Sequence, residues 1–162
     1  MRSVLFVCTA NICRSPMAEG VLHRLLEQRQ LEPKIAIDSV GTHDYHAGEP
    51  PFPKAAAAAK RRGYEIGHLV ARRITPEDLD KFDMILAMDR ANIAHLRTVV
   101  PTRCKQKIEL LLEYGDKHHG KDVPDPYGSD DKAYERALDM IEDGCAGLVE
   151  YLARVHEKSR RR

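Results

Sequence analysis

The sequence predicts an α/β fold in which a parallel sheet carries helices on both faces. Short apolar segments rich in β-forming residues alternate along the chain with longer segments of helical periodicity, as in strands joined by helical crossovers. The first segment, residues 3–8, is almost wholly apolar, as a strand buried on both faces would be. The chain has 162 residues, of which 43% are hydrophobic and 31% charged, and this composition suits one globular core.

The first half of the chain contains two expected strands and two expected helices. After the strand at 3–8, a helix is expected to open at Ser15-Pro16, because serine suits the N-cap and proline the first helical position. Residues 34–39 form the second strand, and a polar loop follows over 42–53. Residues 54–62 are rich in alanine and form a helix, with a glycine directly after it as the stop.

The second half continues this alternation. Residues 82–88 predict a third strand, followed by a helix over about 89–99 and a short strand around 107–110. A loop rich in His, Gly and Pro spans 114–129. The last element is a helix over about 131–156, whose apolar residues recur at helical spacing.

Length and charge restrict the class of protein. No repeat or linker divides the chain, so residues 1–157 are expected to form one domain, followed by a basic C-terminal tail at 158–162. Lys and Arg total 26 against 25 Asp and Glu, and this near-balance argues against a general nucleic-acid binder.

The location of the protein is expected to be cytoplasmic, with no membrane partner. No apolar run approaches the roughly 18 residues that span a bilayer. The beginning of the chain resembles a signal peptide, but its apolar stretch covers only residues 4–10 and leads directly into Asn11. Four cysteines in a chain of this size do not make a disulfide framework.

The loop after the first strand carries the strongest chemical signal. Cys8 ends the strand, Arg14 stands six positions later at the expected start of a helix, and Ser15 follows. A cysteine and an arginine at this spacing are a weak signal alone, but backbone N–H groups at a helix N-terminus suit a phosphate or a similar oxyanion. The same field favours the ionised form of a thiol held there, which would make Cys8 a nucleophile. The planar guanidinium of Arg14 can hold two phosphoryl oxygens, and the Ser15 hydroxyl can donate to the thiolate.

Three other interpretations of this loop are weaker. Cys8 could simply fill space at the end of a strand. Cys8 and Cys13 could be half of a zinc site, but the sequence has no second Cys or His pair at matching spacing. A dinucleotide-binding loop would need glycines, and none stands between Ser3 and Glu19.

Breaking a phosphate ester would need an acid to protonate the leaving oxygen, and Asp125 is the candidate. Prolines on both sides of Asp125 stiffen its loop. From the residues alone, however, an ordinary turn is the simpler interpretation of this segment.

Taken together, these motifs resemble the low-molecular-weight protein tyrosine phosphatases. The segments that carry the resemblance are Asn-Ile-Cys-Arg-Ser-Pro-Met-Ala-Glu at 11–19 and Asp-Pro-Tyr at 125–127, together with Asp38 to Thr42, Tyr45-His46, His68, Ala71-Arg72 and Phe82 to Asp89. The resemblance covers nearly the whole chain. It implies a small Rossmann-like three-layer fold with four parallel strands, and a reaction through a phosphocysteine intermediate without metal or other cofactor.

The resemblance also assigns roles to individual residues. Cys8 is implied as the nucleophile, Arg14 as the phosphate clamp, and Asp125 as the general acid that later activates water. Tyr45 and Tyr127 resemble the aromatic rim around the substrate ring. Asn11 is implied to hold the loop backbone, with support from Ser39 and His68. The residues implied to bind phosphate or support the loop are Thr9, Ala10, Asn11, Ile12, Cys13, Ser15, Ser39 and His68.

Some residues depart from the family pattern. Ala10 stands where the family usually has Gly, and Gly128 where many members have a second aromatic residue, which leaves a more open rim. Val40 stands where Ala is usual, which is a minor change.

Other activities of similar loops fit less well. A thioredoxin-coupled arsenate reductase would need relay cysteines, but this chain has Ala87 in the third strand and only Cys104 shortly beyond it. Protein arginine phosphatases tend to carry Thr where Ile12 stands, and a branched apolar residue suits a phenyl ring better. A binding module without turnover would not need Cys8 and Asp125 together.

The expected partner is a phosphotyrosine-containing protein substrate, for which a tyrosine kinase is one candidate, and the chain is expected to be a monomer or weak dimer that does not bind nucleic acid. Cys13 raises a regulatory hypothesis as well, in which it forms a reversible disulfide with Cys8 under oxidation, with buried packing as the equal alternative.

Overall fold

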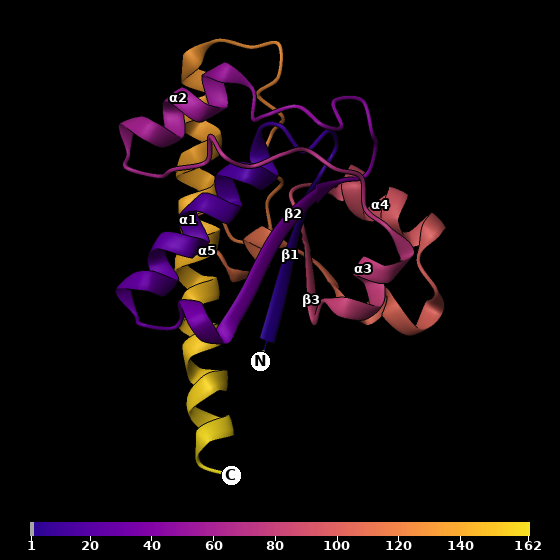
Figure 1. The fold of residues 1–162 in the computed structure, drawn as a ribbon, viewed down its shortest axis with the longest axis vertical. Coiled ribbons are helices and arrows are strands. Elements are labelled where there is room, and N and C mark those ends of the chain that lie inside the picture. The colour runs from indigo at the N-terminus through magenta and orange to yellow at the C-terminus, as the bar shows by residue number, and fades with distance from the viewer. Residues whose placement is uncertain (1) are drawn as a thin grey trace.

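The computed structural model describes residues 2–162, and these fold into a parallel sheet covered by helices on both faces (Figure 1). The strands are β1 (Arg2–Cys8), β2 (Ile35–Gly41), β3 (Met84–Ala87) and β4 (Ile108–Leu110). They are all parallel and lie in the order β2-β1-β3-β4. The predicted fold class is confirmed.

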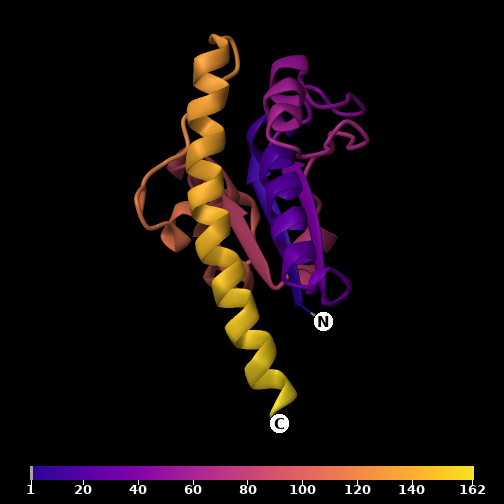
Figure 2. The same cartoon turned by 90° about the vertical axis from the view of Figure 1, so that its left-hand side faces the viewer.

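The helices lie in two groups. The first group comprises α1 (Arg14–Gln28), α2 (Pro53–Arg61) and α5 (Asp131–Arg160), and the second α3 (Pro76–Lys81) and α4 (Arg90–Val99). Figure 2 shows α5 running the length of the molecule beside α1. Three short 3₁₀ helices complete the described chain, at Glu32–Lys34, Thr102–Lys107 and Leu111–Tyr114.

The side chains of β1 alternate between the two faces of the sheet, so the core has two parts, one beneath each group of helices. Val4 and Phe6 pack toward α1, α2 and α5, whereas Leu5 and Val7 pack toward α3 and α4. All four side chains are fully buried, because successive side chains of a strand point to opposite faces and this sheet is covered on both.

The strand order places a binding crevice at the end of β1. From β1 the chain crosses to β2 on one side and then to β3 on the other, so the direction of winding reverses at β1. Ligands of open α/β sheets bind at such a reversal, beyond the carboxyl ends of the strands. Cys8 is the last residue of β1 and therefore lies at this point.

The structure differs from the sequence prediction at two helices, α1 and α3. Helix α1 begins at Arg14 with Cys13 at its N-cap, so the prediction of Ser15 as N-cap is wrong, and the Ser15 hydroxyl bonds elsewhere. Helix α3 was not expected, although Thr75 and Asp78 form a capping box around Pro76, which is a recognisable helix start.

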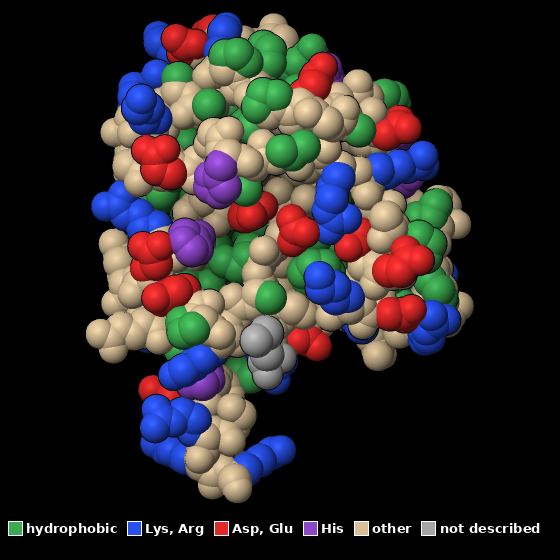
Figure 3. Space-filling view, viewed as in Figure 1, with side chains coloured by type: hydrophobic (Ala, Val, Ile, Leu, Met, Phe, Trp, Pro, Cys, Tyr) green, Lys and Arg blue, Asp and Glu red, His purple; other side chains and the backbone are tan. Residues whose placement is uncertain are grey.

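Helix α5 is longer than the periodicity predicts, because it continues to Arg160. Its last turns extend past the sheet, and Figure 3 shows them surrounded by basic side chains. Lys158 and Arg160 are thus helical residues. The division of the chain into a domain at 1–157 and a tail at 158–162 stays a prediction.

Candidate active site

A small cavity of about 220 Å³ opens at the carboxyl end of β1. The segments around it are the loop between β1 and α1, the loop after β2 and the loop before α5. Its lining residues are Cys8, Thr9, Ala10, Ile12, Cys13, Arg14, Tyr45, His46, Asp125 and Tyr127. Most of the residues predicted for the site therefore meet in one cavity, although they come from three parts of the chain.

The loop after β1 is held by the buried side chain of Asn11. Its backbone has a φ of 60°, in the left-handed region where asparagine is tolerated better than most residues. The amide nitrogen of Asn11 donates to the hydroxyls of Ser15 (2.8 Å) and Ser39 (3.0 Å). Its amide oxygen accepts from the backbone N–H of Arg72 at 3.0 Å. These three bonds fix the strained loop to α1, to β2 and to the segment after α2.

The sulfur of Cys8 has a hydroxyl partner inside this network. Cys8 Sγ lies 3.0 Å from Ser15 Oγ, and both side chains are buried. Because Asn11 already donates to Ser15 Oγ, the hydroxyl hydrogen of Ser15 can point at the sulfur, which is closer than its other acceptor, the Val40 carbonyl oxygen at 3.4 Å. This arrangement stabilises a negative charge on Cys8.

Arg14 is 1% exposed and is held by groups from the segments that follow β3 and precede α5. Its Nη1 donates to Asp89 Oδ2 at 2.6 Å and to the carbonyl oxygen of Val123 at 2.8 Å. Burial lowers the pKa of Arg14, but the neighbouring Cys8 and the Asp89 carboxylate outweigh burial and raise that pKa above its ordinary value. The guanidinium therefore stays charged. Its Nε is buried without a hydrogen-bond partner among the described residues, which leaves this edge for an oxygen of a bound anion.

Asp125 stands at the mouth of the cavity with its side chain 48% exposed. Its Oδ1 accepts from the backbone N–H of Tyr127 at 3.1 Å, and its Oδ2 lies 3.7 Å from Nη2 of Arg14. The carboxyl group is thereby fixed above the loop that contains Cys8 while it remains in contact with solvent.

Aromatic rings surround the mouth. Tyr45 and Tyr127 are 67% and 51% exposed, which is high for large rings. Tyr45 stacks on His43 with centroids 4.8 Å apart, and Tyr127 contacts Phe52 edge-on at 5.3 Å. These contacts hold two exposed rings in place on either side of the opening.

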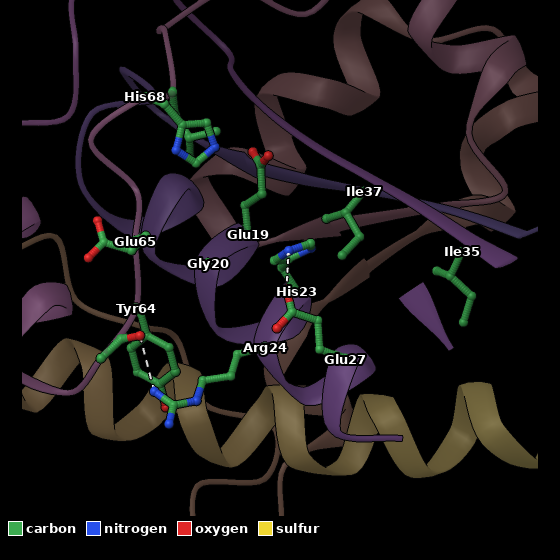
Figure 4. A pocket seen from close by; sticks show the side chains of 12 residues that line it. Glu19, Gly20, His23, Arg24, Glu27, Ile35, Ile37, Tyr64, Glu65 and His68 are labelled. Carbon is green, nitrogen blue, oxygen red and sulfur yellow. Dashed lines mark hydrogen bonds and ion pairs between the residues drawn. The ribbon is translucent and has the colours of Figure 1, made fainter. Parts of the chain in front are cut away.

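Ser39 and His68 were both expected to support Asn11, but only Ser39 contacts it. Ser39 contacts Asn11 as expected, and its hydroxyl donates to Glu19 Oε1 at 2.7 Å. His68 does not join this network. It is exposed and lies in a different cavity, where Figure 4 shows its ring close to Glu19. The second contact of Ser39 is thus Glu19, which extends from α1, and no hydrogen bond joins His68 to Asn11 among the described residues.

Cys13 lines the cavity from below. Its Sγ lies 3.7 Å from the hydroxyl oxygen of Tyr134, and burial raises the pKa of its thiol to about 12. Cys13 is therefore a neutral thiol at physiological pH, in contrast with the charge-stabilising surroundings of Cys8.

Sequence reasoning missed three residues that support this site: Asp89, Glu19 and Arg72. Asp89 had a usable signal, because it directly follows a predicted strand and caps a predicted helix, which places its carboxylate at the same sheet edge as Cys8. Arg72 contributes through its backbone N–H, which any residue except proline could supply. Glu19 lies five residues into α1, where a glutamate is normally a solvated helix residue.

Comparisons with known proteins agree with this geometry. The family model for low molecular weight phosphotyrosine protein phosphatases matches residues 3–160. The chain belongs to this family. The family predicted from the loop motifs is thus confirmed, and with it the class of enzyme, a protein-tyrosine phosphatase and hence a hydrolase.

Relatives in this phosphatase family match along most of their length. The chain is 40% identical over 149 residues to the low molecular weight protein-tyrosine-phosphatase YfkJ of Bacillus subtilis, covering 92% of this chain and 94% of the relative. It is 38% identical over 151 residues to the human low molecular weight phosphotyrosine protein phosphatase, with coverage of 92% and 94%.

Solved structures of the phosphatase family have the same fold. A protein tyrosine phosphatase from Entamoeba histolytica, with Hepes in its active site, superimposes with a TM-score of 0.92 at 35% identity and covers 96% of this chain and 99% of its own. YfkJ from Bacillus subtilis superimposes with a TM-score of 0.89 at 39% identity, with coverage of 95% and 96%. Within residues 2–162, no helix is both long and apolar enough to cross a membrane.

Proposed function

We propose that this chain hydrolyses phosphotyrosine in proteins through a phosphocysteine intermediate, without a metal or other cofactor. The observation that carries the proposal is the convergence of Cys8, Arg14 and Asp125 on one cavity whose mouth is lined by two tyrosines. A tyrosine kinase is one candidate substrate. The chain would act in the cytoplasm as a monomer or weak dimer, independently of nucleic acid and membranes.

In the first step, the Cys8 thiolate attacks the phosphorus atom and the bond between phosphorus and the phenolic oxygen breaks. The Asp125 carboxyl, exposed at the mouth, donates its proton to that leaving oxygen. The cationic Arg14 supplies Nε and Nη2 to the phosphoryl oxygens, while its Nη1 stays with Asp89. The backbone N–H groups of residues 9–14, at the N-terminus of α1, hold the remaining charge.

In the second step, the Asp125 carboxylate takes a proton from water as the water oxygen attacks the phosphocysteine. The bond between sulfur and phosphorus breaks, and inorganic phosphate and the Cys8 thiolate result. The Ser15 hydroxyl, 3.0 Å from the sulfur, donates to the departing thiolate and makes it a better leaving group.

The rim and floor of the cavity favour an aryl phosphate. Tyr45 and Tyr127 offer two faces to a phenyl ring, and the branched side chain of Ile12 lines the cavity between them and the loop. A cavity of about 220 Å³ is small for a whole side chain with its phosphate, so the ring would lie in the mouth between the tyrosines.

The test is hydrolysis of p-nitrophenyl phosphate in the presence of EDTA. We expect metal-independent release of nitrophenol by the unmodified protein and at least a ~10³-fold loss in Cys8→Ser, because nucleophile removal abolishes the covalent step. Cys104→Ser is the matched control, since Cys104 is buried in the other half of the core and should leave the rate unchanged. A folded protein that binds phosphate without turnover would contradict the proposal. Phosphotyrosine, phosphoserine and phosphoarginine peptides then separate the substrate classes.

A further inference from the structure

A second and larger cavity lies on the α1 side of the sheet, beside the edge strand β2. Its volume is about 820 Å³, within the range of sites for small ligands. One wall is the face of α1 that carries Glu19, His23 and Glu27, each four residues after the last, and the other is the segment 63–69. Figure 4 shows the side chains of these two walls together with those of the edge strand. We call this cavity the α1 groove.

The floor of the α1 groove is apolar. Ile35 and Ile37 line it from β2 (Figure 4). Leu69 lines it from the segment 63–69. Ile37 and Leu69 are only partly buried, although both pack against the main core. A space-filling view shows apolar side chains at the bottom of this hollow, with acidic and histidine side chains at its border (Figure 3). An occupant would thus contact methyl groups below and charges at the sides.

The charges around the α1 groove are mainly negative. Three carboxylates line it, from Glu19, Glu27 and Glu65, against the guanidinium of Arg24. That guanidinium is engaged elsewhere, because its Nη1 donates to the carbonyl oxygens of Arg62 and Gly63, both at 3.1 Å, and it lies over the ring of Tyr64. His23 pairs with Glu27 at 2.7 Å and lies at the middle of the groove. The lining thus carries three carboxylates against one guanidinium, with His23 paired to one of the carboxylates.

Glu19 lacks a cationic partner at the inner end of the groove. Its contact is the Ser39 hydroxyl, and among the described residues it forms no ion pair. Burial, with the nearby Asp38 adding to it, raises the pKa of Glu19 to about 7, although the Ser39 hydroxyl and Arg72 oppose the shift. A half-buried carboxyl group with a raised pKa gains when a cation enters beside it.

We infer that the α1 groove binds an elongated aliphatic diamine or polyamine. Glu19 and Glu27 are eight residues apart on α1, which separates them by about 12 Å along the helix axis. Ammonium groups at the two ends of a methylene chain can therefore reach both carboxylates. The chain between them lies over Ile35 and Ile37, in the way that a lysine stem covers apolar surface while its ammonium group stays polar. A neutral ligand would contact the apolar floor but would not pair with the two carboxylates.

The binding is measured by isothermal titration calorimetry of the full chain with 1,8-diaminooctane, in phosphate buffer so that the catalytic cavity is blocked. We expect saturable binding of one molecule, weakened by added salt, because ionic contacts are screened. The diol 1,8-octanediol has the same chain length without charge and should bind at least tenfold more weakly. Binding needs no turnover, so its outcome is independent of the proposed phosphatase reaction.

Two pairs of variants locate the site. Ile37→Lys places a cation on the floor and should abolish binding, whereas Val70→Lys adds the same charge on an exposed residue outside the groove and should not change it. Glu27→Gln should weaken binding about twofold to fivefold, as loss of a partly exposed ion pair does. Glu32→Gln, at an exposed acid outside the groove, is its control.

Several results would overturn the inference. Equal binding of diamine and diol would show that charge is not recognised. Unchanged binding in both Ile37→Lys and Glu27→Gln, with native circular dichroism, would place the amine elsewhere. If Ile37→Lys fails to fold, Glu27→Gln decides alone, because Glu27 is a surface residue whose replacement leaves the core intact.

Discussion

Replacing Asp89 by asparagine removes the carboxylate that Arg14 contacts inside the molecule. Asp89 has two tasks in the structure, since it pairs with Arg14 at 2.6 Å and caps the N-terminus of α4 by accepting from the backbone N–H of Asn92. Asparagine is as good an N-cap as aspartate, so Asp89→Asn removes only the charge, whereas Asp89→Ala removes both functions.

The size of the effect follows from burial. The side chains of Arg14 and Asp89 are only 2% and 19% exposed, and removing one partner of a buried pair costs about 3–5 kcal/mol. Arg14 keeps its bond to the Val123 carbonyl, so we expect Asp89→Asn to lower the free energy of unfolding by about 3 kcal/mol, at the lower end of this range. Loss of the cap adds about 1 kcal/mol, which makes about 4 kcal/mol for Asp89→Ala.

Urea unfolding at pH 7 measures these free energies, and a loss of about 3 kcal/mol corresponds to a fall in Tm of about 6–12 °C for a chain of this size. Asp130→Asn is the matched control, because Asp130 caps α5 in the same way and forms no ion pair among the described residues. The free energy of unfolding of Asp130→Asn should stay within about 0.5 kcal/mol of that of the unmodified protein. A loss below about 1 kcal/mol in Asp89→Asn, or equal losses in the two Asp89 variants, would refute this account of Arg14.

Three further predictions concern the chemistry and the pH dependence of the chain. Asp125→Asn should slow hydrolysis of phenyl phosphate, a poor leaving group, by about 10²-fold or more and that of p-nitrophenyl phosphate less; an unchanged rate with phenyl phosphate would remove Asp125 from the mechanism. The pKa of Glu19 is raised from 4.5 to about 7 in the folded state. Between these two pH values the folded protein binds more protons than the unfolded protein, so the contribution of Glu19 to the free energy of unfolding falls as pH rises. The free energy of unfolding in urea should therefore fall less between pH 5 and pH 8 in Glu19→Gln than in the unmodified protein. Identical decreases would contradict the raised pKa of Glu19. After peroxide treatment, Cys13→Ser should regain less activity with dithiothreitol than the unmodified protein, because Cys8 then lacks a neighbouring thiol that protects it from over-oxidation; full recovery would exclude this role for Cys13.

Local patterns in the sequence were sufficient for most of the fold. The apolar run at 3–8 and the Ser15-Pro16 pair are short-range features. Strand β1 lies within one residue of its predicted bounds, and α1 begins within two residues of its predicted start. The short α3 helix was missed because six residues carry too little periodicity, and only its capping box marks it. Helix α5 extends past its apolar positions because exposed charged residues with good helix propensity continue it.

The candidate site was predictable where one short segment contains it. Residues 8–15 carry the nucleophile, the clamp and the hydroxyl in a single loop, and their spacing is visible in the sequence. Asp125 had no such support from its own neighbours, because an ordinary turn has the same residues. Its role was expected only from the family resemblance, and the structure brings it to 3.7 Å from Arg14.

The sequence by itself determined the class of fold, the family and the chemistry of the loop after β1, because each of these is visible in short segments whose residues are neighbours along the chain. Only the tertiary structure decided that Asp89 holds Arg14, that Glu19 contacts Ser39 while His68 lies outside this network, and that a groove with three carboxylates lies beside β2. These contacts join residues 20 to 75 positions apart, and they form because packing of helices on a parallel sheet brings distant segments to the same edge.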